Sequence, residues 1–144
     1  MNIQRFKCLS NEEITNIERQ FNVSFPNDYK KFLETIGGGV VEKDDSNNIY
    51  VPILGEPIIV DVLYGNEKEK ASITFWMNQY KEDLLDQAVI IGDDLMQGFF
   101  VLICEGQNSG VYYWDDAYNF ECSTDENNMY WIADTFNDFL NLIK

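Results

Sequence analysis

The sequence predicts an α+β domain, with a mainly antiparallel sheet flanked by N-terminal helices and a C-terminal helix. Three observations lead to this prediction. Apolar residues recur at helical spacing near both ends of the chain, short β-rich apolar runs occupy the middle, and turn residues separate those runs. A length of 144 residues, 45% of them hydrophobic, suits a single domain over residues 1–144 with one core.

Two helices are expected at the N-terminal end, over residues 10–21 and 26–36. The first opens with Ser-Asn-Glu-Glu at 10–13, an S-x-x-E capping box in which the serine and glutamate side chains satisfy free backbone N–H groups. The second helix carries apolar residues at i, i+3, i+4 and i+7, which places one stripe against a core: Tyr29, Phe32, Leu33 and Ile36.

Three consecutive glycines, residues 37–39, follow the second helix. A phosphate-binding loop places its glycines after a strand and before a helix, with a lysine following. The order here is reversed, and Val40 and Val41 come next. We therefore expect the glycines to cap the helix and to turn the chain tightly into the sheet.

The middle of the chain is expected to supply the sheet. Its strands are predicted over four segments, residues 49–54, 88–92, 99–104 and 110–115. Residues 57–63 form a further apolar run bounded by turn residues, and the polar segment EKDDSNN at 42–48 is expected to be a loop or a hairpin turn. Apolar stripes predict two more helices, near 71–84 and 133–143.

The net charge of −15 lies entirely in the part of the chain after residue 43. Up to that point six basic residues balance six acidic ones, whereas from residue 44 onward four basic residues face nineteen acidic ones. Between Glu82 and Ile143 there are thirteen acidic residues and no basic residue. A merely solubilising surface normally mixes both signs. One-sided charge indicates a basic partner or electrostatic steering, and it disfavours nucleic acid or anionic lipid as a ligand.

The composition excludes the commonest kinds of catalytic site. The chain has no histidine, so it cannot build a Ser-His-Asp or Cys-His centre or a His-ligated zinc site. Cys104 lies inside an apolar strand run, where burial makes a thiol inert. Pairs of carboxylates can act as acid and base, but among 25 acidic residues close pairs arise easily by chance. We therefore expect no enzymatic activity, no metal and no cofactor.

The sequence also predicts a cytoplasmic location without a membrane partner. The opening segment MNIQRFKCLSNEE is too short and too polar for a signal peptide, and no apolar run approaches the length of a membrane span. The three cysteines form no CxxC motif and are odd in number, which is typical of reduced thiols in a cytoplasmic protein.

Four groups of residues occur in a characteristic order along nearly the whole chain. They are Phe25-Pro26 with Asp28-Tyr29, Phe32-Leu33 and the glycine run; Ile90-Ile91-Gly92 with an Asp pair before Gly98; Gly110-Val111-Tyr112-Tyr113-Trp114-Asp115; and Ile132-Ala133-Asp134-Thr135-Phe136 with Phe139-Leu140. In this order they resemble the SUKH superfamily, whose founding branch includes the Smi/Knr fungal cell-wall regulators. The chain departs from that pattern at Phe25, where Leu is common, at Gly37, where Asn is frequent, and at Asp116, where a histidine is frequent.

The resemblance implies a non-catalytic α+β domain, mostly a bacterial immunity protein that binds and neutralises a toxin domain of a polymorphic or contact-dependent secretion system. The acidity fits a basic nuclease-type toxin, because carboxylates can occupy a surface meant for phosphates. The alternative is a regulatory protein–protein interaction module of the Smi/Knr type without a toxin partner. An acidic DNA mimic would share the electrostatics but not the resemblance. The oligomeric state is left open.

The candidates for partner binding are five residues at predicted strand ends and turns: Asp93, Asp94, Trp114, Asp115 and Asp116. Such positions on a rigid sheet present side chains to a partner, and Trp is enriched at binding hot spots. The plainer interpretation is solvated carboxylates and a Trp114 that belongs to the core or lines a groove. If the aspartates are exposed, replacing Asp115 and Asp116 by lysine should slow association with a basic toxin and leave stability unchanged or slightly higher.

Overall fold

The structure is a computed structural model that describes residues 2–42, 48–96 and 98–143. Its helices are α1 (Asn11–Phe21), α2 (Asn27–Thr35), α3 (Ile73–Tyr80) and α4 (Phe136–Leu142). Its strands are β1 (Ile3–Arg5), β2 (Gly39–Val41), β3 (Asn48–Tyr50), β4 (Pro57–Leu63), β5 (Ala88–Asp94), β6 (Phe99–Ile103), β7 (Gly110–Trp114) and β8 (Met129–Ala133). Short 3₁₀ turns occur at Pro52–Leu54, Glu69–Ala71 and Lys81–Asp83.

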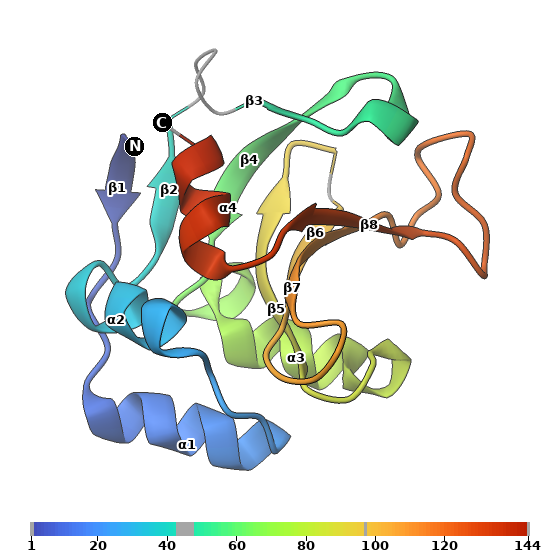
Figure 1. The fold of residues 1–144 in the computed structure, drawn as a ribbon. Helices are drawn as coiled ribbons and strands as arrows, with labels where there is room; N and C mark the ends of the chain where they lie inside the picture. Colours follow the sequence, from blue (N-terminus) through green and yellow to red (C-terminus); the bar gives the residue numbers. More distant parts are fainter. Residues whose placement is uncertain (1, 43–47, 97, 144) are drawn as a thin grey trace.

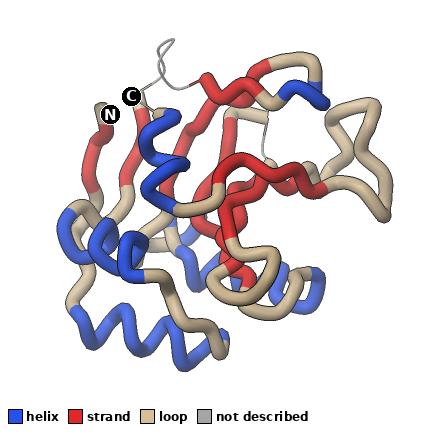
Figure 2. The backbone as a smooth tube through the Cα atoms, viewed as in Figure 1, coloured by secondary structure: helices blue, strands red, loops and turns tan. Residues whose placement is uncertain are grey.

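The strands form one antiparallel sheet in the order β1-β2-β4-β5-β6-β7-β8, with β3 paired to β4 off this path. Figures 1 and 2 show this sheet in the middle of the molecule with the helices around it. Successive strands from β4 to β8 are neighbours in space, as short antiparallel connections require. The predicted α+β class, with an antiparallel sheet flanked by helices, is confirmed.

The helix caps explain where three of the helices begin. The capping box is present at α1: the Ser10 hydroxyl accepts a hydrogen bond from the backbone N–H of Glu13, and the Glu13 carboxylate accepts one from the N–H of Ser10, each at 3.1 Å. Ser72 caps α3 through the N–H of Phe75, and Thr135 caps α4 through the N–H of Asp138. Local sequence therefore sets these boundaries.

Several predicted boundaries were wrong. The strand predicted over residues 49–54 ends at Tyr50, because Pro52 lacks a backbone donor and begins a 3₁₀ turn. The helix predicted near 71–84 is α-helical only from Ile73 to Tyr80. Helix α4 begins at Phe136, because Ala133 still belongs to β8 and Thr135 is the N-cap. Strands β1, β2 and β8 were not predicted, and the residues of β4 were noted as an apolar run without being assigned to a strand. Most of the predicted loop at 42–48 lies outside the described residues.

The central strands are buried on both faces. Every side chain of β6 is at most 5% exposed. Phe99 faces α3, with its ring 5.0 Å from that of Trp76, whereas Phe100 faces α4, with its ring 5.1 Å from that of Phe139. Since successive side chains of a strand point to opposite faces, α3 and α4 cover opposite faces of the sheet. In Figure 1, α2 lies beside α4, and α1 lies beyond α2.

The glycines after α2 bring three backbones close together. Gly37 and Gly38 have φ angles of 82° and 94°, in the left-handed region that favours glycine. A Cβ atom on Gly38 would lie 2.5 Å from the backbone oxygen of Leu63, and the Gly38 oxygen accepts a hydrogen bond from the N–H of Phe6 at 2.9 Å. The glycines therefore cap α2 and let the chain turn into the sheet between β4 and the segment after β1, as the sequence predicts.

We expect Gly38→Ala to lower the free energy of unfolding by about 3 kcal/mol or more, because it adds a backbone clash to an unfavourable φ angle. Gly106→Ala is the matched control. Its φ angle of 96° is nearly the same as that of Gly38, but no heavy atom lies within 4 Å of the added carbon. That change should cost only about 1 kcal/mol. Urea denaturation of both variants measures the difference, and equal costs would contradict the packing explanation.

Candidate functional site

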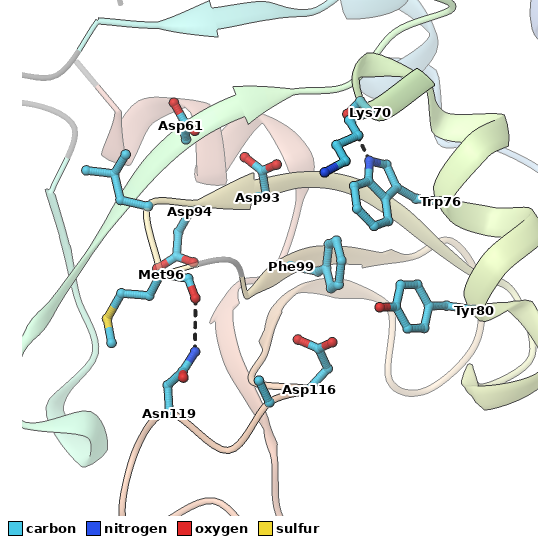
Figure 3. A pocket seen from close by; sticks show the side chains of 12 residues that line it. Asp61, Lys70, Trp76, Tyr80, Asp93, Asp94, Met96, Phe99, Asp116 and Asn119 are labelled. Carbon is cyan, nitrogen blue, oxygen red and sulfur yellow. Dashed lines mark hydrogen bonds between the residues drawn. The ribbon is translucent and has the colours of Figure 1, made fainter. Parts of the chain in front are cut away.

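A pocket of about 380 Å³ opens on the α3 side of the sheet, where the ends of β4 and β5 meet the loop that follows β7. Carboxylates and aromatic rings share its lining, and we call it the acidic–aromatic pocket (Figure 3). Its lining residues are Asp61, Lys70, Trp76, Tyr80, Asp93, Asp94, Leu95, Met96, Phe99, Asp116, Ala117 and Asn119. Its volume lies at the lower end of the usual range for ligand pockets, about 300–1,000 Å³.

A β-bulge shapes the β4 side of this pocket. The register between β4 and β5 shifts between Val60 and Val62, which pair with the consecutive residues Asp94 and Asp93, so β4 has one extra residue at Asp61. The Asp93 carboxylate lies against this irregular segment. It accepts hydrogen bonds from the N–H of Val62 at 3.1 Å and from the hydroxyl of Tyr64 at 2.7 Å. The donors are neutral, so they hold the carboxylate in place without cancelling its charge.

Asp94 closes the turn between β5 and β6. Its side chain is 3% exposed, and one carboxylate oxygen accepts hydrogen bonds from the N–H of Gly98 at 2.8 Å and the hydroxyl of Tyr113 at 3.2 Å. Only glycine fits at position 98, because a Cβ atom there would lie 2.1 Å from the Tyr113 oxygen. Burial raises the pKa of Asp93 and that of Asp94 to about 6 each.

Asp116 supplies a carboxylate from the loop after β7. Burial raises its pKa, and the neighbouring Asp115 charge raises it further. One of its carboxylate oxygens is inaccessible to solvent and has no hydrogen-bond partner among the described residues. A buried oxygen without a partner costs stability. Asp116 therefore resembles Asp93 and Asp94 in being held where its charge is unfavourable.

Aromatic rings form the opposite wall. Trp76 and Tyr80 are one helical turn apart on α3, and their rings stack with centroids 6.1 Å apart. Phe99 packs against both, at 5.0 Å and 5.3 Å. The Trp76 indole N–H donates to the backbone oxygen of Lys70 at 2.8 Å, which fixes the ring. In Figure 3 the Lys70 side chain extends toward the space between Trp76 and Asp93.

Two of the predicted surface carboxylates are buried, so their expected surface position was wrong. Asp94 is described above, and Asp115 is 0% exposed. Asp115 organises the loop between β7 and β8: its carboxylate accepts hydrogen bonds from the N–H groups of Asn119 and Phe120 and from the Ser123 hydroxyl, at 2.9, 3.0 and 2.5 Å. Replacement by lysine, which was expected to leave stability unchanged, would remove this acceptor and bury a cation.

The structure brings together three of the five candidates, Asp93, Asp94 and Asp116, around the acidic–aromatic pocket. Trp114 is 8% exposed and packs behind the wall, with its ring 5.5 Å from Tyr80 and 5.8 Å from Phe99. That position agrees with the plainer interpretation of Trp114. Contact with a partner stays a prediction for all five residues.

Sequence reasoning missed Asp61, Tyr64 and Phe99 as parts of this site. Asp61 carried a usable signal, because a charged residue inside the apolar run of residues 57–63 is unusual for a buried strand. The spacing of Trp76 and Tyr80 on one helical stripe indicated a shared face. Nothing in the sequence showed that this face would meet the ends of β4 and β5.

Three further features of the described residues concern thiol reactivity, metal binding and membrane insertion. Cys104 follows the last residue of β6 and is only partly buried against the core, which corrects its expected place inside a strand. Burial still raises the pKa of its thiol to about 12, so the thiolate is disfavoured at neutral pH. No group of three or more His, Cys, Asp or Glu side chains in residues 2–42, 48–96 and 98–143 is arranged to hold a metal ion. Within the same residues, no helix has the length and apolar character needed to span a membrane. The expected lack of catalysis stays a prediction.

The raised pKa values predict that the protein is more stable at pH 5.0 than at pH 7.5. Between the ordinary value of 3.8 and about 6, folded Asp93 and Asp94 hold protons that the unfolded chain has released. Stability therefore falls as the pH rises through this range. We expect a gain of about 1 kcal/mol per carboxyl on going from pH 7.5 to 5.0.

The test replaces the two buried carboxyls, whose charged and titratable neighbours are known, and compares them with an exposed aspartate. Asp61, Tyr64 and Asp94 face Asp93, and Tyr113 and Asp115 face Asp94. Changing Asp93 and Asp94 to asparagine removes both titrating groups and should flatten the pH dependence of the thermal midpoint. At position 94 one oxygen can still accept both hydrogen bonds, and at position 93 the asparagine oxygen can accept from Val62 while its amide group donates to the Tyr64 hydroxyl. Asp86→Asn, at an exposed position away from this pocket, should keep the parent slope. Equal slopes in the three proteins would contradict the assignment.

Asp115→Ala should lower the free energy of unfolding by about 3 kcal/mol, because three donors lose their acceptor in a buried loop. The measurement is chemical denaturation at pH 7.5. Asp86→Ala removes the same charge from an exposed turn and should change stability by no more than about 0.5 kcal/mol. A variant at position 115 as stable as the parent would show that this carboxylate does not hold the loop.

Comparison with known proteins identifies the family. The sequence model of the SMI1 / KNR4 family (SUKH-1) matches residues 8–142, which contain α1 to α4 and every residue that lines the acidic–aromatic pocket. No curated protein sequence shows a significant match to the chain. The family match covers far more than half of the chain and agrees with the resemblance found in its motifs. The chain belongs to the SMI1 / KNR4 family (SUKH-1).

Proposed function

We propose that this chain is a non-catalytic immunity protein that binds and neutralises a cognate toxin domain. The toxin is proposed to be a basic, nuclease-type domain of a bacterial polymorphic or contact-dependent system, met in the cytoplasm. The observation that supports this proposal is the uncompensated acidity of the second half of the chain. Residues 82–143 contain thirteen acidic residues and no basic one, and membership of the SUKH-1 family makes an immunity role plausible.

The distribution of charge suits such a partner. The one salt bridge recorded among the described residues joins Lys30 to Glu18 at 3.5 Å, in the part of the chain where charges balance. The acidic part contributes a summed negative field that no basic side chain of residues 82–143 screens. A nuclease carries a positive surface for phosphates. An acidic protein that covers this surface blocks substrate access, and its field accelerates the encounter.

A regulatory interaction module without a toxin partner is the alternative function. The acidic–aromatic pocket favours it as much as it favours immunity, because a pocket of this kind can hold a side chain of any basic protein. The two functions differ in their genetic context. An immunity gene stands next to a gene for a secreted protein that ends in a small toxin domain, whereas a regulatory module has no such neighbour.

The test is protection of growth. The toxin domain encoded beside this chain's gene is expressed from an inducible promoter in a sensitive bacterium, with and without this chain. We expect growth only when the chain is present, and a stable complex of the two purified proteins. Soluble, folded chain that gives no protection would contradict the proposal. The absence of any toxin gene beside it would favour the regulatory alternative.

A further inference from the structure

The acidic–aromatic pocket combines three features that together select a ligand. It is concave, one wall is made of ring faces and edges, and the other wall is made of carboxylates whose hydrogen bonds come from neutral groups. Trp76, Tyr80 and Phe99 form the first wall, and Asp93 and Asp116 reach the pocket from two separate elements. An apolar ligand would desolvate these carboxylates with the exposed Lys70 as the one basic residue in the described lining, and an anion would be repelled by them.

We propose that this pocket receives the guanidinium group of an arginine side chain on the surface of the partner protein. The inference rests on the proposed function, because that function supplies a basic partner. It adds the site at which one arginine side chain of that partner binds. A guanidinium is planar, stacks on aromatic faces and donates several hydrogen bonds in one plane. It therefore matches a site with rings on one side and carboxylate oxygens on the other.

No salt bridge to Asp93 or Asp116 is recorded among the described residues, so an entering cation would be their first ionic partner. Asp116 lines the pocket from the loop after β7. Its loop is tied to the pocket, since the Asn119 side chain donates to the backbone oxygen of Met96 at 2.9 Å. Asp115 anchors the same loop from beneath. A guanidinium in the pocket would bring counter-charge to Asp116 and to Asp93 together.

Lys70 is the one basic residue that lines the described part of this pocket, and it is exposed. Its backbone oxygen holds the Trp76 indole, while its side chain is long and flexible. A lysine ammonium is a strongly hydrated point charge that lacks the planar fork of arginine. Lys70 is therefore expected to leave the pocket when an arginine side chain enters.

The experiment uses a small probe, so that it does not depend on the toxin. N-acetyl-arginine N-methylamide is titrated into the ¹⁵N-labelled full chain, and the indole N–H resonance of Trp76 is followed by NMR. The corresponding citrulline compound, which is uncharged and almost the same shape, and the lysine compound are the matched probes. We expect a saturable shift with the arginine probe, binding at least about fivefold weaker with the lysine probe, and no saturable shift with the citrulline probe.

Two variants separate local binding from the overall field. Asp116→Asn removes one charge inside the pocket, and Asp86→Asn removes one charge from an exposed turn outside it. Asp116→Asn should weaken binding of the arginine probe about fivefold or more, whereas Asp86→Asn should change it less than about twofold. The Trp76 resonance is assigned with Trp76→Phe.

Several results would overturn the inference. They are no shift at Trp76 with the arginine probe, equal binding of the citrulline or lysine probe, and equal effects of the two aspartate substitutions. The protection assay keeps the two proposals apart. Arginine binding without protection of growth leaves the pocket assignment standing and rejects the immunity function. If the chain protects growth, Asp116→Asn does not weaken that protection, and the arginine probe does not bind, then the pocket assignment is rejected and the immunity function stands.

Discussion

The burial of β6 on both faces is the constraint on which the rest of the structure depends. A strand of five apolar residues, none more than 5% exposed, cannot lie at the surface of a sheet that is covered on one side only. One helix must therefore cover Phe99 and another must cover Phe100. The chain meets this requirement with α3 between β4 and β5 and with α4 after β8. Each helix brings its aromatic stripe to one face, and the position of α3 places Trp76 and Tyr80 beside the strand ends where the pocket forms.

Elements that are stabilised locally could be predicted from the sequence, and elements that depend on distant partners could not. The capping box of α1 and the apolar stripes of α2 and α4 are complete within a few residues, so their positions were correct to within one to three residues. Strands β1 and β2 have three residues each, too few to show alternation. They are strands because of their pairing with distant segments, β1 with β2 and β2 with both β1 and β4. Of β8, only Ala133 fell within the predicted helix at 133–143, and residues 129–132 were assigned to no element.

The candidate site shows the same limit at the level of single residues. Asp115 and Asp116 are adjacent in the sequence and chemically identical. Asp115 is nevertheless fully buried and accepts hydrogen bonds within the loop between β7 and β8, whereas Asp116 lines the pocket. The difference arises because the chain after β7 folds back and offers the N–H groups of Asn119 and Phe120 to the first aspartate. Alternation along the strand ends at Trp114 and says nothing about the residues beyond it. Local sequence indicated a concentration of acids at strand ends, and only the fold distinguished structural acids from pocket acids.

In the proposed complex the acids would act over two distances, and each distance requires a different placement of the carboxylates. A steering field depends on the sum of many charges, falls off over about 8 Å in physiological salt, and depends little on the position of any one carboxylate. Binding in a pocket depends instead on the position of each carboxylate, because a carboxylate orients a ligand only if it is fixed and partly desolvated. Desolvation that raises the pKa of Asp93 and Asp94 to about 6 opposes their ionisation in the folded state at neutral pH. A cation in the pocket would offset that cost, since an opposite charge favours the ionised form. In the proposed complex, Asp93 would therefore weaken the isolated protein and stabilise the bound one.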